Sequence, residues 1–318
     1  MTTILITGIG GDIAQGIATI VRRVFPDWRI VGMDIHDRHG GALVTDAVYR
    51  APAVPDARYL PWLEDLVARE QVDVCLPTSE AELIELSRLG IDSVGSARLV
   101  MANPSAIAVG SDKLRTAEFL NSINISTPWT LPAESFDAAT PLPCIFKARR
   151  GAGSKSVFVC RSAEDVEFYR ARHASAIVQE WLQPDTNEVT CGVYRTRTGE
   201  VSVVQLLRTL VGGFTGWAQV IQNAEVESQC RRVAEALDLR GSINVQLRIT
   251  DAGPRIFEIN PRFSSTVLMR HLMGFADVEW SLRESAGQPV VLTQPAVGTI
   301  GVRVQGAALC PASSGENR

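Results

Sequence analysis

Short apolar segments alternate with amphipathic segments over the first hundred residues. Continuous apolar runs at residues 3–10, 28–35 and 72–78 are typical of strands that are buried on both faces. The segments 14–24 and 59–71 have the three-to-four-residue apolar spacing of amphipathic helices. Short strands separated by helices form right-handed βαβ units, so this part of the chain is predicted to be a doubly wound parallel sheet.

The pattern changes near residue 110. A polar Ser-Asp pair opens an amphipathic helix at residues 111–123, and further helices are expected at 224–237 and 278–286. The other apolar runs are separated by turns rich in glycine, aspartate and threonine, which is typical of an antiparallel sheet. These expected strands, with their turns, cover residues 144–160, 176–182, 188–196, 200–211, 243–249 and 255–260.

Composition and charge exclude several classes of protein. The chain has 318 residues, which suggests two domains, and a content of 46% hydrophobic and 21% charged residues is ordinary for a globular protein. A net charge of −4, without a dense block of lysine and arginine, disfavours nucleic acid and anionic membranes as partners. The longest apolar runs fall well short of the roughly 20 residues that a membrane-spanning helix needs.

The N-terminus and the cysteines predict the cellular compartment of the protein. The first three residues lead directly into an apolar strand, without the basic and apolar regions of a secretion signal. The six cysteines are scattered without a Cys-x-x-Cys pair, and most lie in apolar runs. They are expected to be small core residues of a cytoplasmic protein rather than disulfides or zinc ligands.

A glycine-rich segment follows the first predicted strand. Gly8 and Gly10 open a helix and Asp34 ends the next strand, which is the layout of a dinucleotide-binding fingerprint. The spacing fails at its last position, because the sixth residue is Ile13 and the next glycine is Gly16. A tight turn with close helix–sheet packing is therefore favoured over the binding of NAD.

A third interpretation of the same edge of the sheet stays open. Residues 10–12 and residues 77–82 both follow predicted parallel strands. They should meet at the carboxyl edge, where open α/β sheets bind ligands. Both segments are candidates for the lining of a substrate pocket.

Two strands near the C-terminal end are predicted to pair as a hairpin. The segments 243–249 and 255–261 flank Thr-Asp-Ala-Gly-Pro at 250–254, which is a turn sequence. If these five residues form the loop, Ile249 faces Arg255.

This register places polar side chains opposite one another. Gln246 is then opposite Glu258, and Asn244 is opposite Asn260. Directly opposed residues have Cβ atoms about 4.5–5.5 Å apart, and side chains two residues apart share a face. One patch of the sheet thus gathers a carboxylate and up to three amide oxygens, which are the donors that Mg²⁺ accepts from a protein.

The end of the second strand adds a cation to this patch. A buried Glu258 without a cation would be costly or would become protonated. Pro261 cannot donate to a ladder, so the strand ends there, and Arg262 follows with a guanidinium suited to phosphate oxygens. A solvated hairpin face on which Arg262 pairs with Glu258 is the alternative.

Further segments precede this hairpin in a fixed order. Residues 144–156 are a strand with Lys147 and then a loop of glycine, serine and lysine, and residues 176–188 are a strand with acidic residues at its end. Together with Phe-Glu-Ile-Asn-Pro-Arg at 257–262, they resemble the ATP-grasp superfamily, in particular the large subunit of carbamoyl-phosphate synthetase and related stand-alone ligases. The resemblance covers about residues 105–290.

The resemblance implies a fold and a division into domains. Residues 1–109 would be a Rossmann-like, doubly wound unit of the kind that precedes an ATP-grasp fold. Residues 110–187 would be the lid, residues 188–308 the antiparallel core with the metal-binding hairpin, and residues 309–318 a flexible tail. The fold class is then α/β for the first unit and α+β for the whole chain.

The resemblance also implies roles for individual residues. Lys113 and Lys147 would contact the ATP phosphates, and Lys147 would act in catalysis with Arg262, which steadies the transferring phosphoryl group. Glu188 would accept hydrogen bonds from the ribose. The remaining nucleotide contacts would come from a glycine loop and from an exposed strand with the residues beyond it, namely Gly151, Gly153, Ser154, Lys155, Ser156, Gln179, Glu180, Trp181 and Leu182.

The implied metal ligands are Gln246, Glu258 and Asn260, which would hold one or two Mg²⁺ ions, with Mn²⁺ as a substitute. Two departures from the family pattern stand out. The loop has fewer glycines than many relatives carry, and Gln246 stands where many relatives have an acidic residue. One negative charge fewer should weaken a second Mg²⁺.

The implied reaction is an ATP-dependent ligation. A carboxylate would attack the γ-phosphate to give an acylphosphate and ADP, and an amine would then displace phosphate, behind a lid that excludes water. Three alternatives stay open: a kinase-like enzyme with a stable phosphorylated product, an NAD(P)-dependent oxidoreductase that uses the first domain, and a nucleotide-binding module without turnover. The oxidoreductase leaves the acidic hairpin unexplained.

The partners are expected to be a small-molecule carboxylate and an amine, whose identities the sequence does not specify. Arg208 and residues 212–217 are open either as acceptor-binding elements or as a plain hairpin connection. The oligomeric state is also open, with a homodimer among the options.

Overall fold

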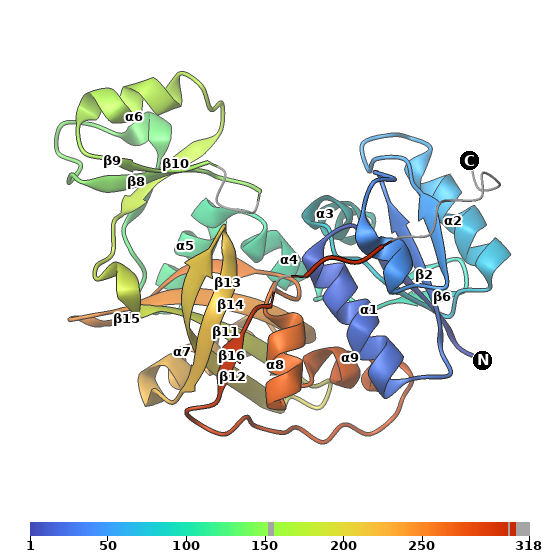
Figure 1. The fold of residues 1–318 in the computed structure, drawn as a ribbon. Coiled ribbons are helices and arrows are strands. Elements are labelled where there is room, and N and C mark those ends of the chain that lie inside the picture. Colours follow the sequence, from blue (N-terminus) through green and yellow to red (C-terminus); the bar gives the residue numbers. More distant parts are fainter. Residues whose placement is uncertain (152–155, 305, 310–318) are drawn as a thin grey trace.

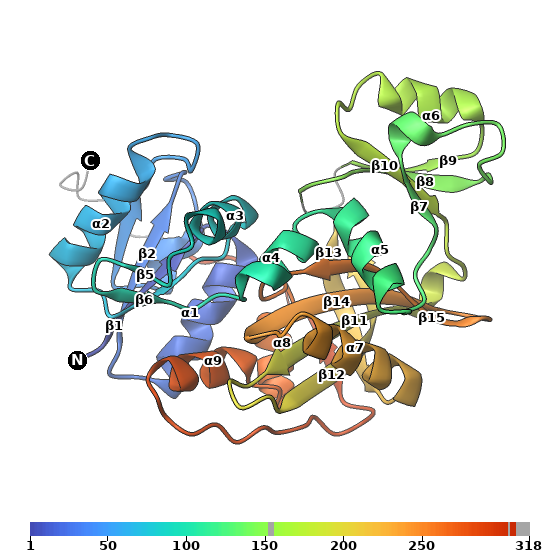
Figure 2. The same ribbon diagram turned by 180° about the vertical axis from the view of Figure 1, so that it is seen from behind.

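The computed structural model describes residues 1–151, 156–304 and 306–309, which contain three β-sheets (Figure 1). The N-terminal unit lies beside an antiparallel core, and a small four-stranded sheet stands on top of that core, as the view from behind also shows (Figure 2). The expected flexible tail lies outside the described residues apart from Leu309.

The N-terminal sheet is parallel except at one edge. Its strand order is β3-β2-β1-β4-β6-β5, and only β5 and β6 pair in the antiparallel sense. The strands are β1 (Thr3–Thr7), β2 (Arg29–Asp34), β3 (Ala47–Arg50), β4 (Val74–Leu76), β5 (Ser93–Val94) and β6 (Ala97–Leu99). The predicted parallel sheet is confirmed. The sequence pattern revealed only β1, β2 and β4, because the other three strands are too short to show periodicity.

Helices cover both faces of this sheet. Ile4 and Ile6 pack in a cluster with α1, whereas Leu5 packs in another cluster with Leu63 and Leu66 of α2. Burial on both faces explains why the strands read as continuous apolar runs. The strand order reverses between β1 and β4, so the loops after these strands meet at a topological switch point. The helices are α1 (Asp12–Val24), the 3₁₀ turn η1 (Gly40–Leu43), α2 (Tyr59–Glu70) and α3 (Glu80–Leu89).

A small subdomain follows two linking helices. Its antiparallel sheet has the order β7-β10-β8-β9, and Phe146, Val166 and Val178 belong to its own apolar cluster. Because β10 lies between β7 and β8, the prediction of an exposed strand at residues 179–180 is wrong. The elements are α4 (Pro104–Gly110), α5 (Lys113–Ser122), β7 (Thr130–Pro132), η2 (Ala133–Ser135), β8 (Cys144–Ala148), β9 (Val157–Cys160), α6 (Ala163–Arg170) and β10 (Ala176–Glu180).

The core is a six-stranded antiparallel sheet of order β15-β14-β11-β12-β13-β16, which confirms the predicted antiparallel pattern. Val189 and Cys191 of β11 pack in one cluster with α7, whereas Tyr194 packs in another with Phe275 and Trp280 near α8 and α9. Residues 212–217 are a turn and the start of β13. The elements are η3 (Asp185–Asn187), β11 (Glu188–Arg195), β12 (Val201–Val211), β13 (Phe214–Ile221), α7 (Ala224–Ala236), β14 (Gly241–Thr250), β15 (Gly253–Asn260), α8 (Val267–Met273), α9 (Asp277–Ser285) and β16 (Ile300–Val302).

The buried cysteines agree with the expectation of small core residues, as far as the structure describes them. The five cysteines at 75, 144, 160, 191 and 230 are buried and free, and Cys310 lies outside the described residues. Across the same part of the chain, no helix combines the length and apolar character that crossing a membrane requires.

Candidate functional site

The hairpin of β14 and β15 brings the predicted polar side chains together. Gln246 pairs with Glu258 and Asn244 pairs with Asn260, so the predicted cross-strand pairs are confirmed. Asn244 is buried, and its Oδ1 accepts a hydrogen bond from the Thr190 hydroxyl at 2.9 Å. One face of the hairpin therefore carries a carboxylate and three amide groups.

The predicted register at the turn itself is wrong by one residue. Ile249 pairs with Pro254 rather than with Arg255, and the turn has two residues instead of five. The register shifts after Gln246, which leaves Phe257 as the extra residue of a β-bulge. The bulge brings Phe257 and Glu258 toward the same side and restores the predicted pairing beyond it.

Two lysines from other elements face Glu258. The Nζ atom of Lys113, the first residue of α5, lies 3.7 Å from Glu258 Oε1 and donates to the Gly151 carbonyl at 2.8 Å. Lys147 of β8 is only 5% exposed, and its Nζ lies 5.6 Å from the centre of the Phe257 ring. The two predicted phosphate-binding lysines and the predicted metal-binding carboxylate thus converge from three separate elements.

The surroundings of Lys147 change its proton affinity. Burial, together with the neighbouring charge of Lys113, lowers its pKa from 10.5 to about 8 against the opposing effect of Glu258 and Glu188. The ammonium group is therefore protonated at neutral pH although it is poorly solvated. Such a cation gains more from an incoming phosphate than an exposed lysine does.

Glu188, which was predicted to bind a ribose, is held by two arginines. Its Oε1 accepts from Nε and Nη2 of Arg208 at 3.0 and 2.6 Å, and its Oε2 accepts from Arg248 at 2.7 Å. Arg248 also donates to the Leu182 carbonyl at 2.8 Å. Sequence reasoning missed Arg248, because pairing between distant strands leaves no local signal. A ribose hydroxyl would have to share Glu188 with these arginines.

The side chains at the end of β10 are engaged by other parts of the protein. Gln179 is buried and donates to the Thr130 hydroxyl at 2.9 Å, next to it in the sheet. Glu180 accepts from Arg255 of the hairpin at 2.6 Å. Both predicted nucleotide residues therefore have partners within the protein, and Glu180 connects the subdomain to the strand that carries Glu258.

The structure describes some of the remaining residues that were predicted to bind the nucleotide. Trp181 is half-buried and Leu182 is buried, directly after β10. Gly151 and Ser156 are the described ends of the glycine loop, and the Gly151 N–H lies 3.4 Å from an oxygen of Glu80. Three predicted residues lie outside the described part of the chain, namely Gly153, Ser154 and Lys155.

Arg262 lies at the end of the hairpin, between the core and the first domain. Burial lowers the pKa of its guanidinium, while the negative charges of Glu80, Glu258 and Asp12 raise it. The ion pair of Glu258 within the described residues is formed with Lys113, so the alternative in which Arg262 pairs with Glu258 is wrong. Arg262 therefore faces carboxylates from both domains without a close pair to Glu258.

The oxygen donors of the hairpin fit a hard divalent cation that brings ligands of its own. Gln246 and Asn260 supply neutral amides, and Glu258 supplies the carboxylate. Over the described ranges, no group of three or more His, Cys, Asp or Glu side chains is placed to hold a metal. Mg²⁺ usually takes one or two carboxylates and completes its shell with water and phosphate oxygens. The donor set therefore suits a Mg²⁺ that binds together with a polyphosphate.

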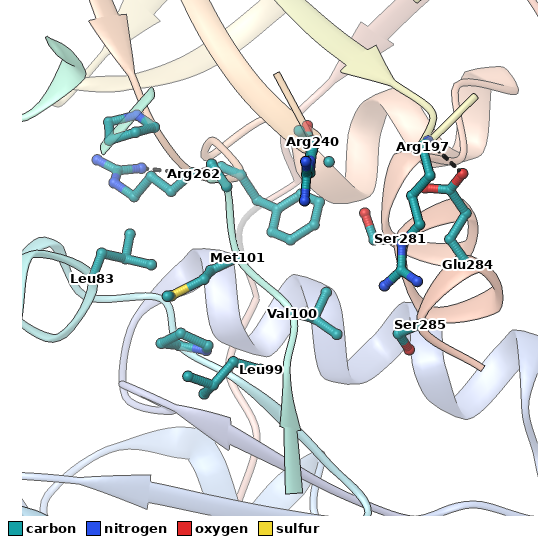
Figure 3. Close-up of a pocket in the computed structure, with 16 residues that line it drawn as sticks. Leu83, Leu99, Val100, Met101, Arg197, Arg240, Arg262, Ser281, Glu284 and Ser285 are labelled. Carbon is teal, nitrogen blue, oxygen red and sulfur yellow. Dashed lines mark hydrogen bonds between the residues drawn. The ribbon is translucent and has the colours of Figure 1, made fainter. Parts of the chain in front are cut away.

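A cavity of about 80 Å³ lies next to Arg262, between the first domain and the core (Figure 3). Its lining combines apolar side chains such as Met101 with Arg197 and Arg240. Figure 3 shows the Arg262 guanidinium turned away from these two arginines. The cavity is separate from the candidate metal ligands, since none of the three lines it.

The glycine-rich loop of the first domain uses its polar groups internally. The Asp34 carboxylate accepts from the N–H groups of Gly10 and His36, both at 2.9 Å. A Cβ atom on Gly10 would lie only 2.9 Å from an oxygen of Asp34. The close approach explains the glycine, and it supports the tight-turn interpretation because the carboxylate that a dinucleotide would need is already engaged.

Comparison with known proteins identifies the central part of the chain. Residues 110–266 match a family model described as the ATP-grasp domain. The chain contains an ATP-grasp domain. The matched segment includes Lys113, Lys147 and the hairpin up to Arg262, so the resemblance predicted from the sequence is confirmed.

Two curated relatives each align with a part of this chain. A carbamoyl-phosphate synthase of Methanobrevibacter smithii is 25% identical over 128 residues, which cover 38% of this chain and 35% of that protein. A D-alanine–D-alanine ligase of Thermotoga petrophila is 35% identical over 96 residues, which cover 28% of this chain and 30% of that protein. The aligned segments thus span about a third of these relatives.

Solved structures share the fold over most of this chain. N5-carboxyaminoimidazole ribonucleotide synthetase of Thermus thermophilus has a TM-score of 0.71 at 21% identity, over 92% of this chain and 80% of that one. The Staphylococcus aureus N5-carboxyaminoimidazole synthetase, in complex with ADP, has a TM-score of 0.75 at 18% identity, over 95% and 80%. At these identities the likeness shows the fold, and it confirms the predicted fold class.

Proposed function

We propose that the chain is an ATP- and Mg²⁺-dependent ligase that joins a carboxylate to an amine through an acylphosphate and releases ADP and phosphate. The main support is the convergence of Lys113 and Lys147 on Glu258 within an ATP-grasp domain. Two cations suited to phosphates thereby face a carboxylate suited to a metal. The names of the curated relatives, a synthase and a ligase, agree with this class.

In the proposed reaction, an oxygen of the acceptor carboxylate bonds to the γ-phosphorus while the bond from that phosphorus to ADP breaks. The amine nitrogen then bonds to the acyl carbon, phosphate leaves with the electron pair of the C–O bond, and the nitrogen loses a proton to solvent. Arg262 and Lys147 would stabilise the charge on the transferring group by position and electrostatics. Mg²⁺ held by Gln246, Glu258 and Asn260 would neutralise phosphate charge.

A coupled turnover assay tests this proposal. Mg·ATP is supplied with carboxylates and amines in pairs from a library, while ADP, phosphate and product mass are measured. ADP release should require both substrates, and the product mass should equal the sum of the two minus water. Glu258→Gln should lower turnover by about 10²–10³-fold. Glu279→Gln on α9, where Glu279 pairs with Arg283, is the matched control that should keep full activity.

Other outcomes of the same assay would contradict the ligase. A stable phosphorylated product without a coupled amide would favour the kinase-like enzyme. Binding of reduced nicotinamide with no melting shift on addition of ATP would favour the oxidoreductase. The hydrogen bonds that Asp34 accepts within its own loop argue against that outcome. ATP binding without turnover of any pair would favour a nucleotide-binding module.

We also propose the finer assignments. The domains divide at about residues 109 and 187, and the core ends at about residue 308. One Mg²⁺ binds more tightly than a second because Gln246 is neutral, and Mn²⁺ substitutes for it. The enzyme acts in the cytoplasm on small molecules, alone or as a homodimer, and binds neither nucleic acid nor membranes.

A further inference from the structure

A buried carboxylate outside the predicted site lies at the start of α5. Asp112 is 1% exposed and caps this helix, because one of its oxygens accepts from the N–H groups of Leu114 and Arg115 at 3.1 and 3.3 Å. The same carboxylate lies 2.7 and 2.9 Å from Nε of Arg149 and 3.7 Å from Nε of Arg150. Asp112 therefore connects the linking helix α5 to the segment that follows β8.

Contacts of the next residue reinforce this connection. The N–H of Lys113 donates to the Arg149 carbonyl at 3.0 Å, and its Nζ donates to the Gly151 carbonyl at 2.8 Å. The same Nζ lies 3.7 Å from Glu258. Residues 149–151, which lead from Lys147 into the glycine loop, are thus attached to the first turn of α5, and that turn faces the metal-binding hairpin.

The negative charge of Asp112 is more than a helix cap requires. Neutral Asn or Ser caps a helix about as well as Asp does. Burial alone would raise the pKa of Asp112, but Arg149 and the two capping N–H groups more than compensate and hold the pKa below its usual value. The charge is therefore explained by the arginines that follow β8, rather than by the helix.

We propose that Asp112 is a positioning residue for ATP, which holds Lys113 and the segment 149–151 where they meet the phosphates. The inference rests on the proposed function, since it assigns these groups to ATP. Asp112 does not itself touch the nucleotide. Its effect should therefore fall on the phosphates and not on the nucleoside.

Asp112→Asn separates the two roles of this side chain. The amide keeps an oxygen for the cap but turns an N–H group toward Arg149, which removes the ionic contact. We expect the affinity for Mg·ATP, measured by calorimetry, to fall about tenfold, the scale of a lost charged hydrogen bond, while the affinity for adenosine is unchanged. Arg149→Ala should cause the same loss, and the double variant should be no weaker than either single one.

Asn223→Ala is the control for a lost helix cap. Asn223 accepts from the N–H groups of Glu225 and Val226 at 3.0 and 3.1 Å at the start of α7, whose buried residues belong to the same apolar cluster as Leu120 of α5. It should lower Tm and leave the Mg·ATP affinity unchanged.

Three outcomes would overturn the inference. One is an unchanged Mg·ATP affinity in Asp112→Asn, and another is an equal loss of affinity in Asn223→Ala. The third is an equal loss for adenosine, which would mean that the whole site had been distorted. In all three the wild type still binds Mg·ATP, so the proposed function is untouched. A wild type that does not bind Mg·ATP would overturn the proposed function, and this inference with it.

Discussion

Two carboxylates in different parts of the molecule show how an enclosed acid differs from one that faces a cation. Glu82 in α3 is 5% exposed and accepts from the hydroxyls of Thr7, Ser79 and Tyr59 at 2.6, 2.7 and 2.8 Å. It fixes the loops after β1 and β4 with neutral donors. Glu258 instead faces the cation of Lys113.

The difference follows from the two kinds of sheet. The parallel sheet is covered on both faces, so Glu82 of the covering helix α3 is enclosed and accepts from three hydroxyls. The antiparallel sheet is apolar toward α7, while its other face carries charged side chains such as Glu188 and Arg248. A carboxylate on that face remains available to an incoming cation. The contrast predicts that a change from glutamate to glutamine lowers turnover at Glu258 and lowers the stability of the fold at Glu82.

Glu258→Gln should have the largest effect on activity. Loss of the only carboxylate among the candidate metal ligands should lower turnover by about 10²–10³-fold, the usual cost of removing a group that stabilises transition-state charge. The midpoint of thermal unfolding should hardly change, because Glu258 has no hydroxyl partner among the described residues that would be left unsatisfied. Turnover and Tm are measured on the same preparation. Activity near the wild-type level would remove Glu258 from the site.

Lys147 should make ATP binding depend on pH. Because the pKa of Lys147 in the protein without ATP is about 8, its ammonium group loses the proton as the pH rises above that value. The affinity for Mg·ATP should then fall by up to about tenfold per pH unit. Calorimetric titrations between about pH 7 and 9.5 measure this.

The stability of the free protein should respond in the opposite direction. The folded-state pKa of Lys147 lies below its ordinary value of 10.5, so between these values the unfolded chain binds more protons. The contribution of Lys147 therefore makes the folded state more stable as the pH rises through this window. Lys147→Met should abolish both trends. A wild-type slope that persists in this variant would assign the titration to another group.

Glu82→Gln should reverse the pattern seen at Glu258. The amide cannot accept from three hydroxyls at once, so the free energy of unfolding should fall by about 1–3 kcal/mol. Denaturant titration measures this loss. The Mg·ATP affinity of the folded fraction should equal that of the wild type, and a weaker affinity would show that Glu82 is part of the site.

Gln246→Glu should have the smallest effect. A second carboxylate opposite Glu258 should strengthen Mg²⁺ binding, which would lower the Mg²⁺ concentration for half-maximal turnover a few-fold. The control is Gln219→Glu on β13, which should leave the Mg²⁺ dependence unchanged. If both variants lowered the Mg²⁺ concentration for half-maximal turnover equally, the cause would be the added negative charge in general and not its position beside Glu258.

The hairpin shows how far the sequence could predict the site. Alternation and turn composition were enough to pair Gln246 with Glu258, although the assumed five-residue loop was wrong and a bulge was not foreseen. The two errors cancelled at this position. A bulge is set by packing on both faces of a sheet, for which a single sequence has no clear signal.

Contacts between distant segments were the other feature of the site that the sequence could not predict. The resemblance was sufficient to select Lys113 and Lys147, because each stands at a recognisable place in the order of segments. It could not predict that Asp112 pairs with Arg149, or that Arg208 and Arg248 hold Glu188. These partners are joined only by tertiary structure, and arginines in a strand read in the sequence as ordinary surface charges.

The bulge at Phe257 has a practical consequence for engineering this hairpin. Ile256 and Ile259 both belong to the apolar cluster beneath the sheet, although they are three positions apart. In a regular strand, residues on the same face are separated by an even number of positions. Strict alternation counted forward from the turn would place Glu258 inward and Ile259 outward, because it ignores Phe257, the extra residue of the bulge. A grafted strand should therefore be counted backward from Asn260, never forward from the tip.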